Sequence, residues 1–239
     1  MTKSSNDKLI PVVQQLQEFA FSQQGSITLL RILGYALLVL ALFDIIEMFI
    51  PPNFMNPVWE FQTLGALVER VPVPLIGLVL VFFGELYSRT KWEFPILKVI
   101  SWLTLFFAVL FILLIPLGIV NTVRLNSQSS TQISTISTQQ ISQAEQVEKQ
   151  LNQATPEQIN NLLKRQGRSL DGKNPQELKS ELLSEVSLAK TKIKSQAEAT
   201  QSLQGLNLIK TSVKWNLGAL VSGALFFIIW KQTNWARQS

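Results

Sequence analysis

Four long apolar runs stand out along the chain, at residues 27–50, 71–87, 95–120 and 213–230. Each is close to the ~20 apolar residues that a helix needs to cross a ~30 Å hydrocarbon core. The first three follow one another closely, whereas the polar residues 121–212 separate the third from the fourth. The pattern predicts an all-α, polytopic membrane protein with four transmembrane helices, three in residues 27–120 and one in 213–239, and a long extramembrane segment.

The residues before the first run, 1–26, are expected to form an N-terminal arm. Apolar positions recur at helical spacing over 9–21, which predicts an amphipathic helix at the membrane surface or against the protein's own helices. Gly25-Ser26 predicts a break before the first membrane helix. That helix is too long for a cleaved signal peptide, so we expect it to remain as an anchor.

The second membrane helix is expected to span 71–87, because Pro72 and Pro74 fit a helix entry, where a missing amide donor matters least. The preceding residues 54–70 carry Trp59 and Phe61 among polar positions. This composition predicts a short helix at the membrane interface, with Trp59 at the depth of the aromatic belt.

The polar residues 121–212 contain two apolar seams at the 3-4 spacing of a coiled coil, so they predict a long antiparallel helical hairpin. Two helix-start signals lie between the seams: Thr155-Pro156-Glu157-Gln158 and Asn174-Pro175. The seams contain many small and polar residues, so the hairpin either packs loosely on itself or meets a partner. The seam positions are Ile133, Ile136, Val147, Leu151, Leu178, Leu182, Val186 and Ile193.

Five charged residues lie in or beside the apolar runs: Arg31, Asp44, Glu47, Arg70 and Glu85. Arg31 lies about one turn inside the first helix, where its side chain can snorkel to the headgroups. In an antiparallel pair of helices, Arg31 comes level with Glu85, and Arg70 with Asp44 and Glu47. The carboxylates either form a proton or cation site or pair structurally with the arginines, and the pattern favours pairing.

A basic tip is expected where the hairpin turns, formed by Lys164, Arg165, Arg168 and Lys173. Anionic polysaccharide, lipid headgroups or an acidic protein would suit it, although a solvated surface is the simpler interpretation. Its glycines do not match the phosphate-binding loop G-x-x-x-x-G-K-[ST], because Asn174 follows the lysine and no strand precedes it.

The amino-acid composition argues against an enzyme or a metal-binding protein. The chain has no Cys and no His, which removes thiolate chemistry, Cys- or His-bound metals and the commonest general base. No catalytic constellation is present, so we expect neither an enzyme nor a cofactor. The net charge of +5 arises largely from Lys and Arg beside the apolar runs, which indicates topology rather than nucleic-acid binding.

The positive-inside rule predicts the orientation. Arg89, Lys91 and Lys98 place the second loop in the cytoplasm, and four spans then put both termini there as well. The hairpin falls on the periplasmic or lumenal side of a plasma (inner) or thylakoid membrane.

The layout resembles the HpsJ-like family, which is cyanobacterial and named for hormogonium polysaccharide secretion. The residues that carry the resemblance are Leu30-Arg31-Ile32-Leu33-Gly34, Leu42-Phe43-Asp44-Ile45, Thr155-Pro156-Glu157 and Asn174-Pro175, followed by a final membrane helix. The resemblance implies an inner-membrane accessory protein of polysaccharide secretion associated with gliding motility, and it supplies no catalytic residues.

Three functions remain open on the sequence. The leading one is a non-enzymatic membrane scaffold or accessory subunit whose hairpin binds a membrane-protein partner or complex. The second is an assembly or stability factor of a large, photosynthetic membrane complex. The third is a small proton- or ion-coupled transporter component that uses Asp44, Glu47 and Glu85. A homo-oligomer is compatible with each.

Overall fold

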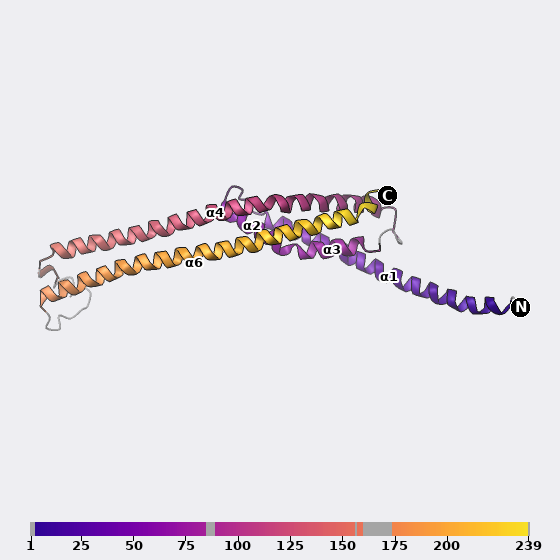
Figure 1. The fold of residues 1–239 in the computed structure, drawn as a ribbon, viewed down its shortest axis with the longest axis horizontal. Helices are drawn as coiled ribbons and strands as arrows, with labels where there is room; N and C mark the ends of the chain where they lie inside the picture. The colour runs from indigo at the N-terminus through magenta and orange to yellow at the C-terminus, as the bar shows by residue number, and fades with distance from the viewer. Residues whose placement is uncertain (1–2, 85–88, 156, 160–173, 239) are drawn as a thin grey trace. The chain divides into compact units, whose positions relative to one another are not determined.

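The computed structural model describes residues 3–84, 89–155, 157–159 and 174–238, and these residues are almost entirely helical (Figure 1). No strand occurs among them, which confirms the all-α prediction. The helices are α1 (Lys3–Met48), α2 (Pro57–Arg70), α3 (Pro72–Phe82), α4 (Glu93–Gln153), α6 (Pro175–Gln232) and α7 (Asn234–Gln238).

Four helical stretches are long and apolar enough to cross a membrane: Gly25–Met48, Pro57–Phe82, and parts of α4 and α6. The chain is therefore an integral membrane protein by the length and composition of its helices. The second stretch differs from the prediction, because it joins α2 to α3 and α3 ends at Phe82, short of Tyr87. α2 packs into the first unit: Phe61 and Leu64 are buried, and the Phe61 ring lies 4.6 Å from that of Trp215 in α6. Its expected place at the membrane interface stays a prediction.

The predicted break at Gly25-Ser26 is wrong, since α1 continues through both residues. One glycine inside a helix costs only about 1 kcal/mol relative to alanine, which a helix of this length can tolerate. The side chains of residues 9–21 lie outside the description, so the expected amphipathic face stays a prediction.

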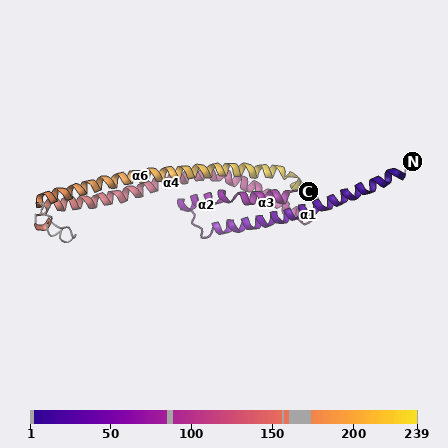
Figure 2. The same cartoon turned by 90° about the horizontal axis from the view of Figure 1, so that it is seen from below.

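The chain divides into two compact units, residues 1–122 with 211–239, and residues 123–210. In the first unit, α1 packs against α3, and the two helices lie beside each other in Figure 2. Their backbones approach closely at Gly34 and Gly77. The core continues between α4 and α6, where the rings of Phe111 and Phe226 stack at 5.6 Å.

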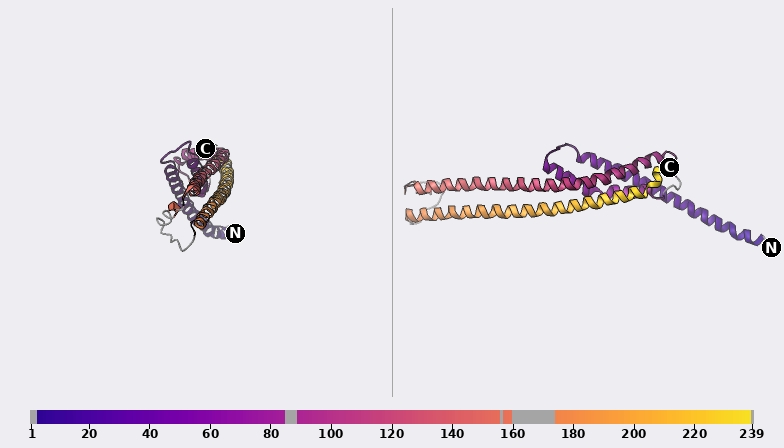
Figure 3. Two further views of the ribbon diagram at one scale, coloured as in Figure 1. Left: turned by 90° about the vertical axis from the view of Figure 1, so that its left-hand side faces the viewer. Right: turned by 45° about the horizontal axis from the view of Figure 1, so that its top comes forward.

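The second unit consists mainly of the polar parts of α4 and α6, which lie side by side in Figure 3. Four side-chain hydrogen bonds join the two helices. The further along α4 a bonded residue lies, the nearer its partner is to the start of α6. The bonds run from Ser129 to Gln204, from Gln201 to Ser130, from Lys190 to Glu148, and from Lys179 to the carbonyl of Asn152.

Local sequence signals account for the helix ends. Asn56 caps α2 by accepting a 3.0 Å hydrogen bond from the Val58 amide, with Pro57 at the first helical position. Gly84 follows α3 with a φ of 75°, a left-handed conformation that favours glycine after a helix. The Thr155 amide donates to Gln158 Oε1 at 3.1 Å, as a capping box requires, whereas Pro156 is outside the description.

Candidate functional site

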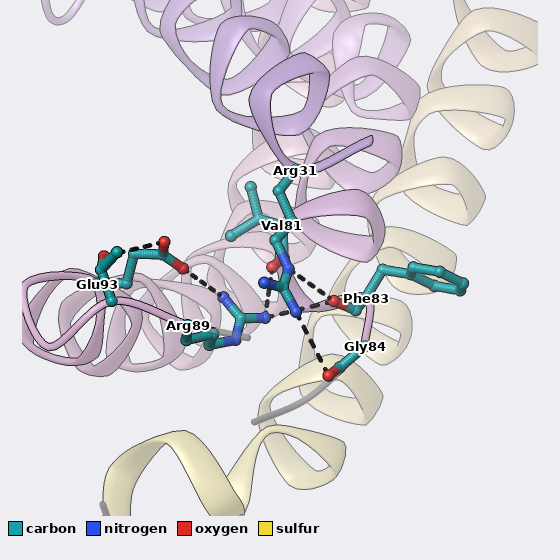
Figure 4. Close-up of polar contacts among 7 residues, drawn as sticks. Arg31, Val81, Phe83, Gly84, Arg89 and Glu93 are labelled. Atoms are coloured by element: carbon teal, nitrogen blue, oxygen red, sulfur yellow. Dashed lines mark hydrogen bonds and ion pairs between the residues drawn. The ribbon is translucent and has the colours of Figure 1, made fainter. Parts of the chain in front are cut away.

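Two arginines, Arg31 and Arg89, reach the C-terminal end of α3 (Figure 4). Arg31 of α1 is only 4% exposed and donates from Nε to the Phe83 carbonyl at 3.1 Å and from an amino nitrogen to the Gly84 carbonyl at 3.4 Å. The last carbonyls of a helix have no partner within it and carry the negative end of the helix dipole. Arg31 supplies both hydrogen bonds and positive charge there, so the prediction that it snorkels to the headgroups is wrong.

Arg89 reaches the same end of α3 from the following loop. It donates to the Val81 carbonyl at 2.9 Å and to the Phe83 carbonyl at 3.5 Å, and its other amino group pairs with Glu93 at 3.3 Å. Its side chain is fully buried. Burial, and then the nearby Arg31, lower the pKa of the Arg89 guanidinium from its ordinary value. The predicted partner of Arg31, Glu85, lies outside the described residues.

The second predicted pairing joins α1 to α2. Arg70 lies 3.7 Å from the Asp44 carboxylate and also donates to the Asp44 carbonyl at 3.2 Å. Both side chains are nearly half exposed, and Glu47 is exposed as well. Among the described residues, no three acidic side chains come together in a way that could hold a metal ion. The arrangement serves as a contact between helices at this end of the bundle.

A buried polar network links α2, α4 and α6, and the sequence analysis did not identify it. Asn121 is fully buried and donates to Glu60 Oε2 at 2.8 Å, and Thr122 donates to Ser212 Oγ at 2.6 Å. Asn216 donates in turn to the Ser212 hydroxyl at 3.1 Å. The available signal was three short polar side chains, Asn121, Ser212 and Asn216, beside apolar runs. Such side chains form hydrogen bonds between membrane helices.

The opposite end of the first unit has a second network that the sequence analysis missed. Arg237 donates to Ser101 Oγ and to the Trp230 carbonyl, both at 2.6 Å, and its guanidinium lies 4.6 Å from the Trp230 ring centre. Ser101 also exchanges a 2.7 Å hydrogen bond with Thr233. These contacts hold α7 against α4. The sequence offered no signal for them, because Arg237 is a single arginine in a short C-terminal segment.

In the second unit, the partly buried positions follow the 3-4 spacing, but not at every predicted residue. Ile133 and Leu151 on α4 lie in the seam, as do Leu178, Leu182, Val186 and Ile193 on α6. Ile136 and Val147 do not, being 55% and 46% exposed. Each precedes a seam position, Ser137 or Glu148, by one residue, a rotation of about 100° around the helix.

Between α4 and α6 in the second unit, polar side-chain contacts are more prominent than buried apolar ones. Lys190 Nζ donates to Glu148 at 2.6 Å, and this hydrogen bond raises the pKa of Lys190. Within the described part of residues 123–210, only Leu151 and Ile159 are buried apolar side chains, at 6% and 2% exposure. The basic tip, Lys164, Arg165, Arg168 and Lys173, lies outside the described residues.

Apolar helices, interhelical polar networks and a polar helical unit thus define a polytopic, all-α integral membrane protein. Within this class, the model of the HpsJ-like protein family matches residues 25–234, so the chain belongs to that family, as the resemblance indicated. No curated protein and no solved structure matches the chain. Two residues of the first motif, Arg31 and Gly34, are among those with which α1 holds α3.

Proposed function

We propose that this protein is a non-enzymatic accessory subunit of membrane machinery for polysaccharide secretion, linked to gliding motility. Residues 123–210 would form an antiparallel helical hairpin outside the membrane that binds a partner protein. Membership of the HpsJ-like family supports this proposal, because the resemblance to that family implies a role in hormogonium polysaccharide secretion. The four membrane-spanning helices would hold the hairpin at the membrane.

One observation supports the binding role: among the described residues of the second unit, few apolar side chains are buried and several large ones are exposed. Ile136, Leu188 and Leu203 are 55%, 67% and 62% exposed. Exposed apolar side chains on helices suit a partner whose own apolar surface covers them. The polar seam would then give the hairpin its register, and the partner would supply the missing burial.

The test is affinity purification of the tagged full-length protein from its native membranes in mild detergent, followed by mass spectrometry. Co-purified glycan-synthesis, secretion or pilus components support the proposal. Photosystem or other energy-transducing subunits would instead favour an assembly factor of a photosynthetic complex.

Matched variants locate the binding surface. Val186→Asp places a charge in the seam, Leu188→Asp places it at an exposed apolar position, and Ser184→Asp places it at an exposed polar position of the same helix. We expect the first two to lose the partner and the third to retain it, with equal membrane insertion. Full recovery of the partner by Val186→Asp and Leu188→Asp contradicts a hairpin-mediated interaction.

The proposed orientation has both termini in the cytoplasm and the hairpin in the periplasm or lumen. Because the chain contains no cysteine, single cysteines report topology without a background. A membrane-impermeant maleimide should label Ser184→Cys from the non-cytoplasmic side and leave Ser4→Cys unlabelled until the membrane is opened. The reverse pattern would invert the topology.

A further inference from the structure

An apolar cavity of about 290 Å³ lies within the first unit, between α1, α3 and α4. Tyr35 and Leu38 line it from α1, Leu78 from α3, and Leu103 and Phe107 from α4, with Phe226 of α6 also in its wall. Its size is near the lower end of the ~300–1,000 Å³ of small-molecule sites. The bundle therefore contains space that its own side chains do not fill.

A smaller cavity continues this space along α1. The two cavities share Ala41, Ile45, Pro74, Phe107 and Phe226, and the smaller one extends to Met48, Asp44 and Arg70. From Tyr35 to Met48, α1 rises by about 20 Å. The combined space follows α1 from Tyr35 to Met48, and Asp44 and Arg70, which form an ion pair, line its smaller part.

The larger cavity opens onto the outer surface of the first unit. Three of its lining residues, Val39, Leu42 and Leu103, are 50%, 54% and 46% exposed, so they form a rim on the outer surface of the bundle. All three lie in helical stretches apolar enough to cross a membrane. The hydrocarbon chains of the bilayer are the molecules that meet this rim.

The size and the apolar lining of the cavity decide which kind of molecule can fill it. Water is a poor candidate, because apolar cavities of this kind stay dry. A partner helix, about 10 Å across with its side chains, is too wide for a space of about 290 Å³. A single extended hydrocarbon chain is narrow, flexible and apolar, and it matches the length between Tyr35 and Met48.

We infer that this space holds one acyl chain of a bilayer phospholipid, with the headgroup near the half-exposed Asp44–Arg70 pair. The chain enters across the rim formed by Val39, Leu42 and Leu103 and lies against Phe107 and Phe226. It acts as a structural lipid that completes the packing between α1 and α4. This inference is independent of the proposed role in secretion, since it depends only on the first unit.

Photolabelling with a chain-specific probe tests it. The full-length protein is reconstituted in phosphatidylethanolamine and phosphatidylglycerol vesicles containing a phospholipid with a diazirine at the end of one acyl chain. Leu78, Thr104 and Phe226 line the cavity but are only 5%, 1% and 2% exposed, so a bilayer chain reaches them only from inside. We expect adducts on these three residues after irradiation. Leu113, which is 64% exposed, serves as the label for ordinary bilayer contact.

Filling the cavity gives the matched control. Ala41 lines both cavities, so Ala41→Phe should lower adducts at Leu78, Thr104 and Phe226 by at least about tenfold and leave Leu113 unchanged. Ala41→Leu is the smaller replacement if the phenylalanine variant does not insert stably, and it should give a graded loss. An absence of adducts at the three buried residues in the wild type overturns the inference, as does labelling that neither replacement reduces.

Discussion

Gly34 of α1 lies directly against Gly77 of α3. A Cβ atom built on Gly34 would be 2.9 Å from the Gly77 carbonyl oxygen and 2.8 Å from the Val81 amide nitrogen. Both contacts are with backbone, which cannot rotate away as a side chain does. Small residues allow membrane helices to approach this closely, and packing of this kind drives their association in lipid.

Gly34→Ala should therefore destabilise the first unit by about 1–3 kcal/mol through overpacking, and Gly34→Val by more. Gly25→Ala is the matched control, because a Cβ on Gly25 in the same helix meets nothing within 4 Å. Thermal unfolding of the purified protein in detergent measures both. Equal unfolding temperatures for Gly34→Ala and Gly25→Ala would show that α1 and α3 do not pack through Gly34.

The guanidinium of Arg31 should matter for its shape as well as its charge. Arg31→Lys retains the positive charge but loses the planar fork that reaches the Phe83 and Gly84 carbonyls. We expect a loss of about 1.5–3 kcal/mol, the usual range for a hydrogen bond to a charged group. The same change at the exposed Arg124 should be neutral in the same unfolding assay. An unaffected Arg31→Lys variant would show that Arg89 alone satisfies this helix end.

The membrane helices could be predicted because an apolar run near 20 residues has few alternatives to spanning a bilayer. The Asp44–Arg70 pairing also followed from the sequence, since two antiparallel helices bring charges at equal depth together. Both predictions depend only on how deep each residue lies along the membrane normal, which can be counted directly from the sequence.

Features that depend on the rotation of a helix about its axis, or on whether a helix continues through a glycine, were harder to predict from the sequence. The predicted seam was wrong at Ile136 and Val147, because the neighbouring Ser137 and Glu148 take the partly buried positions. At Glu148 the contact with Lys190 accounts for this choice. The break at Gly25-Ser26 failed because neighbouring helical turns outweigh one glycine. The cavity beside Ala41 is lined by side chains of α1, α3, α4 and α6 that are distant in sequence, and no local pattern encodes how they meet.

Asp44→Asn separates a structural pair from an ion-coupling site. The Asp44–Arg70 pair is nearly half exposed on both sides, and exposed pairs contribute about 0–1 kcal/mol. We expect normal expression, insertion and secretion phenotype for this variant, with Glu47→Gln as the neighbouring control. Loss of secretion or motility with intact expression would contradict the accessory-subunit proposal in favour of proton or cation coupling.

The hydrogen bond from Lys190 to Glu148 should be visible in the reactivity of the lysine. It raises the pKa of Lys190 above its ordinary value of 10.5, so less free amine is present near pH 9 than for an unperturbed lysine. The contribution of this hydrogen bond to the stability of the second unit is accordingly complete below the unfolded pKa of Lys190 and is lost as the pH rises through the folded one. Glu148→Gln removes the carboxylate and should increase the rate of Lys190 acetylation by an activated ester several-fold at this pH. The exposed Lys194, one turn further along α6, should react at the same rate in both proteins. Equal rates for Lys190 with and without the Glu148 carboxylate would show that α4 and α6 do not meet at this level in solution.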